Sequence, residues 1–128
     1  MSPERTVLLV DDEVEILESL RRALRNEDYA VATTTSPLEA LALIGKGGID
    51  LVVAAIDMPE MTGHELVARV RRDHPEVVRI LLTGGASLDS ALEAINQGEV
   101  HRYLTKPWQN RDLCQTLREA LARLDERR

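Results

Sequence analysis

The chain has 128 residues, 44% of them hydrophobic and 30% charged, a balance that is typical of one globular domain and excludes a disordered chain. The formal net charge of −6 argues against direct nucleic-acid contact, and no apolar run approaches the roughly 20 residues that span a bilayer. Cys114 is the only cysteine, so a disulfide framework is excluded and we expect a reducing, cytoplasmic compartment.

Short aliphatic runs alternate with amphipathic stretches five times along the chain. The runs are too short for buried helices, and several are apolar on both faces, as parallel strands covered by helices require. We expect strands over residues 6–10, 29–33, 51–56, 77–82 and 101–105. Five strand–helix units with short connections predict an α/β fold, a doubly wound parallel sheet with helices on both faces.

The intervening stretches carry helix signals. Ser36 and Thr62 each precede a glutamate by three residues, which is the pattern of a capping box. Between the strands, apolar residues recur at helical spacing. The predicted buried faces are Val14, Leu17, Leu20 and Leu24; Leu38, Leu41, Ala42 and Ile44; Leu66, Val67 and Val70; Leu88, Ala91, Leu92 and Ile95; and Leu113, Leu117, Ala120, Leu121 and Leu124.

Polar side chains stand directly after the predicted strands, where open parallel sheets bind their ligands. They are Asp11, Asp12, Glu13, Asp57, Thr83 and Lys106. Adjacent aspartates are costly without a neutralising cation, and oxygen-only ligands favour Mg²⁺. A hydroxyl and an ammonium group are what a bound phosphoryl group needs on its remaining oxygens. The residues therefore suggest a magnesium-dependent phosphate site.

Four sequence blocks at four strand ends carry a more specific resemblance. The blocks are Val10-Asp11-Asp12-Glu13, Met58-Pro59-Glu60-Met61-Thr62-Gly63, Leu82-Thr83-Gly84 and Tyr103-Leu104-Thr105-Lys106-Pro107. In this order and spacing the chain resembles the response-regulator receiver domains of two-component signalling. The resemblance covers residues 1–128 as one domain, and it implies a flavodoxin-like sheet with strand order 2-1-3-4-5.

The resemblance also implies a metal site. Asp11 and Asp12 would hold Mg²⁺, with Asp12 the more direct ligand and Asp11 acting partly through water. The backbone carbonyl of Asp57 would complete the protein ligands. These residues alone would also be consistent with a solvated loop that caps the first helix, since acids are favoured there by the helix dipole.

A phosphoryl-binding and switching role is implied for the residues at the last two strands. Thr83 and Lys106 would contact the phosphoryl oxygens, and Tyr103 would turn inward when Thr83 moves toward a phosphate. The Lys106–Pro107 bond is expected to be cis, a geometry found almost only before proline.

The chain departs from the family at the central position. Receiver domains carry the phosphate-accepting aspartate three residues before the Met-Pro pair, and Ala55 stands there. A methyl group cannot form an acyl phosphate, so we expect phosphorylation to be abolished and Mg²⁺ binding to be weakened. Asp57 lies two residues further along, in the loop, and is not expected to substitute.

Two explanations of Ala55 stay open. One is a substitution that blocks phosphorylation, which is favoured because Asp11, Asp12, Thr83 and Lys106 are all intact. The other is a natural pseudo-receiver that acts as a phosphate-independent interaction module. A third class, a hydrolase with an aspartyl-phosphate intermediate, is disfavoured because no acid stands ready at the third strand. We therefore do not expect an enzyme.

The resemblance implies protein partners. A histidine kinase or a phosphotransfer protein would deliver the phosphate. An output domain or partner protein would contact the surface of the last two helices and the fifth strand. No membrane contact and no direct nucleic-acid contact is expected.

Overall fold

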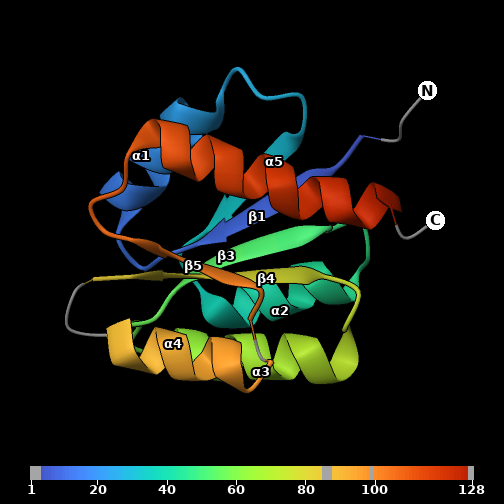
Figure 1. The fold of residues 1–128 in the computed structure, drawn as a ribbon. Helices are drawn as coiled ribbons and strands as arrows, with labels where there is room; N and C mark the ends of the chain where they lie inside the picture. Colours follow the sequence, from blue (N-terminus) through green and yellow to red (C-terminus); the bar gives the residue numbers. More distant parts are fainter. Residues whose placement is uncertain (1–3, 85–87, 99, 127–128) are drawn as a thin grey trace.

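The computed structural model describes residues 4–84, 88–98 and 100–126, in which five parallel strands form one sheet of order β2-β1-β3-β4-β5 (Figure 1). The strands are β1 (Thr6–Val10), β2 (Ala30–Thr34), β3 (Leu51–Ala55), β4 (Val78–Thr83) and β5 (Arg102–Thr105). The helices are α1 (Val14–Leu24), α2 (Pro37–Gly45), α3 (Gly63–Asp73), α4 (Leu88–Asn96) and α5 (Asn110–Glu126). The predicted fold class and strand order are confirmed.

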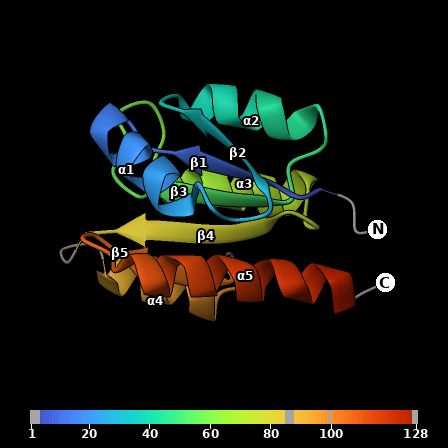
Figure 2. The same cartoon turned by 90° about the horizontal axis from the view of Figure 1, so that it is seen from above.

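Helices cover both faces of the sheet, with α1 and α5 on one side and α2, α3 and α4 on the other (Figures 1 and 2). The core is accordingly split into two clusters. Leu9, Leu20 and Leu117 belong to the cluster under α1 and α5, whereas Leu8 and Val70 belong to the opposite one. Alternating residues of each strand feed the two clusters, which is why the central strands are apolar throughout.

Side-chain caps begin two helices where the sequence predicted them. The Ser36 hydroxyl accepts a hydrogen bond from the Glu39 N–H at 3.1 Å, and the Thr62 hydroxyl accepts one from the Glu65 N–H at 3.2 Å. Each cap satisfies a donor that the first helical turn leaves free. The cap at Thr62 fixes where the chain turns from the loop after β3 into α3.

The predicted face of α2 is wrong at Leu38 and Ala42 and correct at Ile44, with Leu41 partly buried against the core. Leu38 is 53% exposed and Ala42 is also exposed, whereas the helix buries Pro37, Ala40 and Ile44. The burial follows spacings of three and four residues from the proline, so the small Ala40 faces the sheet in place of a leucine. Because most residues of α2 are apolar, their spacing did not indicate which of them face the sheet.

Single residues also differ from the expected pattern elsewhere. Val14 is 55% exposed and Leu92 is 41% exposed, although both were expected on buried faces. Val14 is the first residue of α1. The strands β2 and β4 begin and end one residue later than predicted, and β5 begins one residue later.

An ion pair ties α5 to the turn between α1 and β2. Arg118 donates from Nε and Nη2 to the two carboxylate oxygens of Glu27, both at 2.7 Å. The hydrogen bonds from Arg118 hold the pKa of Glu27 below its ordinary value. The pair lies beside buried Tyr29, whose own pKa is raised by burial. Together these contacts fix α5 against the body of the fold.

Candidate functional site

The carboxyl ends of β1, β3, β4 and β5 lie along one edge of the sheet, and the strand register places the candidate residues there. Val10 pairs with Ala54, so Asp11 follows β1 beside Ala55, the last residue of β3. On the other side Ala55 pairs with Leu82, which precedes Thr83. Adjacent strands are about 4.8 Å apart, so these positions are close neighbours.

Asp11 is the buried acid of this edge. Its side chain is 0% exposed, and Oδ1 accepts a hydrogen bond from the Glu13 N–H at 2.9 Å. Oδ2 lies 2.8 Å from Lys106 Nζ, a distance typical of a charge-assisted hydrogen bond. The contact with Lys106 is therefore a close ion pair.

Lys106 reaches the acids from the end of β5. Its side chain is 23% exposed, and Nζ is also 3.7 Å from Glu13 Oε2. Its backbone N–H donates to the Thr83 carbonyl at 2.8 Å, which continues the β4–β5 ladder past the last strand pair. The Lys106–Pro107 peptide bond is cis. The sequence predicted that Lys106 lies at this edge, but it did not predict the contact between Lys106 and Glu13.

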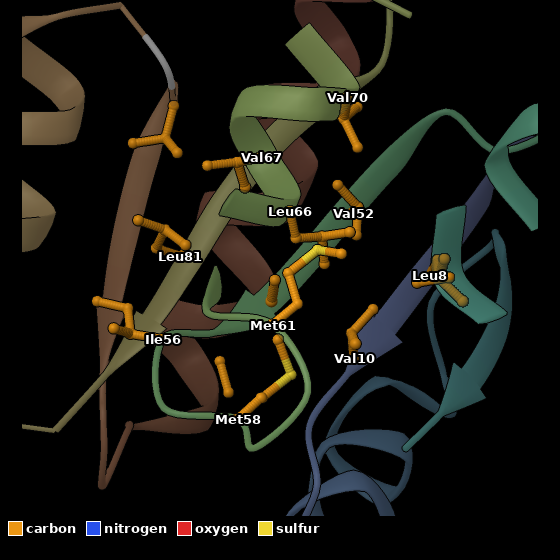
Figure 3. Packing of buried hydrophobic residues seen from close by; sticks show 14 of the residues in the cluster. Leu8, Val10, Val52, Ile56, Met58, Met61, Leu66, Val67, Val70 and Leu81 are labelled. Carbon is orange, nitrogen blue, oxygen red and sulfur yellow. The ribbon is translucent and has the colours of Figure 1, made fainter. Parts of the chain in front are cut away.

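Ala55 is enclosed at the end of β3, where its side chain is 1% exposed and belongs to the cluster under α2, α3 and α4. The loop that follows turns back over it. Figure 3 shows Met58 and Met61 of this loop pointing into the same cluster as Val10 and Leu66. The Ala55 methyl group is therefore buried and belongs to the same apolar cluster as these two methionines.

The loop is closed against β3 by a glycine. The Gly63 N–H donates to the Ile56 carbonyl at 2.8 Å, and a Cβ added at Gly63 would stand 2.3 Å from the Ala55 carbonyl oxygen. No side chain fits at that distance unless the backbone shifts. A residue without a side chain is thus required where α3 meets the residue at position 55.

The other two predicted metal residues are less enclosed. Asp12 and Asp57 are both exposed. Within residues 4–84, 88–98 and 100–126, no group of three or more His, Cys, Asp or Glu side chains is placed to hold a metal ion. The oxygen of Asp11 nearest the edge already faces an ammonium group. The side chains of the described residues therefore do not form a ready divalent-cation site.

Thr83 ends β4, the strand beside Ala55, and Tyr103 lies on β5, one strand further along the sheet. Thr83 is 1% exposed, and its hydroxyl donates to the Gly84 carbonyl at 2.7 Å. Tyr103 is half-buried and packs against the cluster under α2, α3 and α4. The Thr83 hydroxyl is therefore occupied locally in this conformation. Residues 85–87, which follow it, lie outside the described residues.

Within the described residues, no helix is both long and apolar enough to cross a membrane.

The structure is thus an open parallel α/β sheet with acids, a hydroxyl and a lysine at its carboxyl edge. Comparison with known proteins identifies the family, since residues 7–118 match the response regulator receiver domain. The chain belongs to this family. Receiver domains are signalling domains rather than classical enzymes, and they generally bind Mg²⁺.

Individual relatives support the assignment. The chain is 35% identical over 118 residues to the hydrogenase transcriptional regulatory protein HoxA of Cupriavidus necator, which covers 92% of this chain and 24% of that protein. It is 33% identical over 127 residues to the sensor kinase CckA of Brucella abortus, a match that covers 98% of this chain and 13% of that protein. The chain thus spans about a quarter or less of these relatives.

Solved structures agree with the fold. The signal receiver domain of an HD domain-containing protein from Pseudomonas fluorescens is 36% identical to this chain, with a TM-score of 0.91. That similarity covers 99% of this chain and 93% of the other.

Proposed function

We propose that this chain is a receiver domain of the two-component type in which position 55 is the phosphoacceptor position and Ala55 prevents phosphorylation. The observation that carries the proposal is the register of β3. It puts Ala55 at the carboxyl edge, beside Asp11 on one side and next to Thr83 on the other. An aspartate at this position would meet the acids, the hydroxyl and the ammonium group of the edge.

Each remaining residue has a part in that proposal. Thr83 and Lys106 contact phosphoryl oxygens in a phosphorylated form, and Tyr103 responds to the movement of Thr83. With an aspartate at position 55, Asp11, Asp12 and the Asp57 carbonyl would hold Mg²⁺ beside it, and Ala55 weakens this site by removing one ligand. The exposure of Asp57 and its place in the loop support a backbone rather than a phosphate-accepting role.

The proposed partners are a histidine kinase or phosphotransfer protein and an output domain or partner protein. The surface of α4, β5 and α5 supports an output role. It carries the exposed Leu92 and an ion pair between Arg102 and Glu119 at 2.9 Å. The longer relatives named above carry further segments beyond the matched region. We place the domain in the cytoplasm, without direct contact with nucleic acid or membrane.

A phosphate-independent interaction module is the second candidate function. The ion pair between Asp11 and Lys106 favours such a module, because the buried carboxylate is neutralised without phosphate or metal. A natural alanine at codon 55 supports this candidate, and a natural aspartate supports a phosphorylation-blocking substitution in a conventional receiver.

Incubation with acetyl phosphate and Mg²⁺ tests the proposal. We expect no mass gain for this chain and a gain of one phosphoryl group for the Ala55→Asp variant, both measured by intact mass spectrometry. A phosphoryl group that maps to Asp57 in the unmodified chain contradicts the assignment of the acceptor. So does a variant that stays unmodified while it remains folded.

A further inference from the structure

Among the residues that the structure describes, Lys106 is the cation in contact with the completely buried carboxylate at the sheet edge. Asp11 is 0% exposed, and an ionised carboxylate in such a place is strongly disfavoured unless a cation or several donors compensate for the lost water. One backbone N–H reaches Oδ1, and Lys106 Nζ lies 2.8 Å from Oδ2. The ammonium group is the charge that makes burial of Asp11 tolerable.

The charge count at this edge differs from that of a receiver with three carboxylates. Asp11, Asp12 and an aspartate at position 55 would face one ammonium group with an excess of two negative charges. With Ala55, Lys106 lies against the buried Asp11, whereas Asp12 and Glu13 are exposed to water, which screens them. The buried part of the edge then holds one carboxylate against one ammonium group and carries no net charge.

The position of Lys106 is also fixed. Its backbone N–H donates to the Thr83 carbonyl at 2.8 Å, and its ammonium group lies between Asp11 and Glu13, which is 3.7 Å away. A metal ion that approached Asp11 Oδ2 would have to displace this group. The oxygen has capacity for another donor, but the space in front of it is shared with a positive charge.

We propose that Lys106 serves in this chain as a built-in cation that takes the place of a divalent metal beside Asp11. The acidic edge is then complete without Mg²⁺, and the stability and partner binding of the domain do not depend on it. The inference rests on the proposed function, because it takes position 55 as the place where receivers carry their third carboxylate.

The chain offers a matched control for this proposal. It contains two lysines, Lys106 and the exposed Lys46 after α2. Lys106→Met and Lys46→Met remove the same charge and keep a long apolar side chain. They differ in whether the charge lies against the buried carboxylate. Thermal unfolding of both variants and of the unmodified chain is measured in EDTA and in millimolar Mg²⁺.

The expected pattern is specific to Lys106. The midpoint of the unmodified chain and of Lys46→Met changes by less than about 1 °C between EDTA and Mg²⁺, because a ligand that does not bind the folded state cannot stabilise it. Lys106→Met unfolds about 5 °C or more lower in EDTA, since it leaves Asp11 buried without a cation. Mg²⁺ then restores at least half of that loss.

Two results overturn the inference. One is a rise in the midpoint of the unmodified chain with Mg²⁺ that is as large as the rise in Lys106→Met. The other is a Lys106→Met variant that is no less stable in EDTA than Lys46→Met. If Ala55→Asp still accepts a phosphoryl group in either case, the proposed function stands and only the built-in cation fails. If Ala55→Asp accepts no phosphoryl group while Lys106→Met behaves as expected, the proposed function fails and the role of Lys106 beside Asp11 stands.

If the Lys106→Met variant does not fold, a measurement on the unmodified chain tests the proposal instead. The Glu13 amide donates to Asp11 Oδ1 at 2.9 Å, so its NMR signal responds to any ion that binds this carboxylate. We expect the signal to stay in place as Mg²⁺ is raised to millimolar concentration. A saturable shift of the Glu13 amide overturns the proposal.

Discussion

Ala55→Asp is expected to lower the metal-free stability of the domain by about 1–2 kcal/mol, the part of the added charge repulsion that survives screening. The register places position 55 beside Asp11, and the side chain there is 1% exposed. At an effective dielectric constant near 20, two carboxylates about 5–6 Å apart repel each other by roughly 3 kcal/mol before screening and relaxation. Lys106 alone cannot balance both acids.

Mg²⁺ is expected to narrow or reverse this difference. The introduced carboxylate adds the missing oxygen ligand, and an ion that binds only the folded state stabilises it as its concentration exceeds its dissociation constant. Thermal unfolding of both proteins in EDTA and in millimolar Mg²⁺ measures the effect. If Mg²⁺ raises the two midpoints equally, position 55 does not belong to the metal site and the assignment of Ala55 is wrong.

Gly63→Ala is expected to destabilise the domain by about 1–3 kcal/mol or more, because the added methyl group meets backbone rather than a movable side chain. The new Cβ would stand 2.3 Å from the Ala55 carbonyl oxygen and 2.9 Å from the Ala55 carbonyl carbon. Either α3 or the end of β3 must move. Since Gly63 begins α3 and closes the loop over position 55, this variant also disturbs the site.

Gly45→Ala is the matched control for Gly63→Ala. Gly45 is the last residue of α2, and an added Cβ there has no heavy atom within 4 Å. An alanine in a helix is favoured over glycine by about 0.5–1 kcal/mol, so this variant is expected to be equally or more stable. Chemical denaturation of both variants measures the difference. Equal stability of the two would contradict the close approach of Gly63 to β3.

The sequence predicted the fold well because the signals were local and repeated. Buried parallel strands such as residues 51–55 are apolar throughout, and Ser36 and Thr62 mark helix starts by side chains that cap them. The face of α2 could not be predicted, since Leu38 and Ala40 compete within a helix that is apolar on all sides. Which of them faces the sheet depends on how α2 packs, not on spacing alone.

At the site, the sequence predicted which residues meet but not how they pair. The order of the strands brings Asp11, Thr83 and Lys106 to one edge, and strand order followed from the family resemblance. The ion pair from Lys106 to Asp11 and the contact with Glu13 depend on side-chain conformations that no motif encodes. The burial of Met58 and Met61 in the loop after β3 was likewise not predicted, because loop residues are ordinarily expected at the surface.

His101 is half-buried, and its Nδ1 accepts a hydrogen bond from the Arg79 N–H at 3.1 Å. Arg79 itself is buried at 4% exposure in β4 and donates to the Val77 carbonyl. A single arginine in an apolar strand is no sequence motif, so the contacts of Arg79 with His101 and Val77 could not be predicted.

Beryllofluoride binding followed by amide NMR tests the central claim most directly, since this ion mimics a phosphoryl group on an aspartate. A ligand shifts a conformational equilibrium only through contacts that differ between the two states, and here Thr83 and Tyr103 would provide them. With beryllofluoride and Mg²⁺, we expect no change at the Thr83 and Tyr103 amides of this chain and clear shifts at both in Ala55→Asp. Shifts in the unmodified chain, or none in a folded Ala55→Asp variant, would contradict the assignment of position 55 as the phosphoacceptor position.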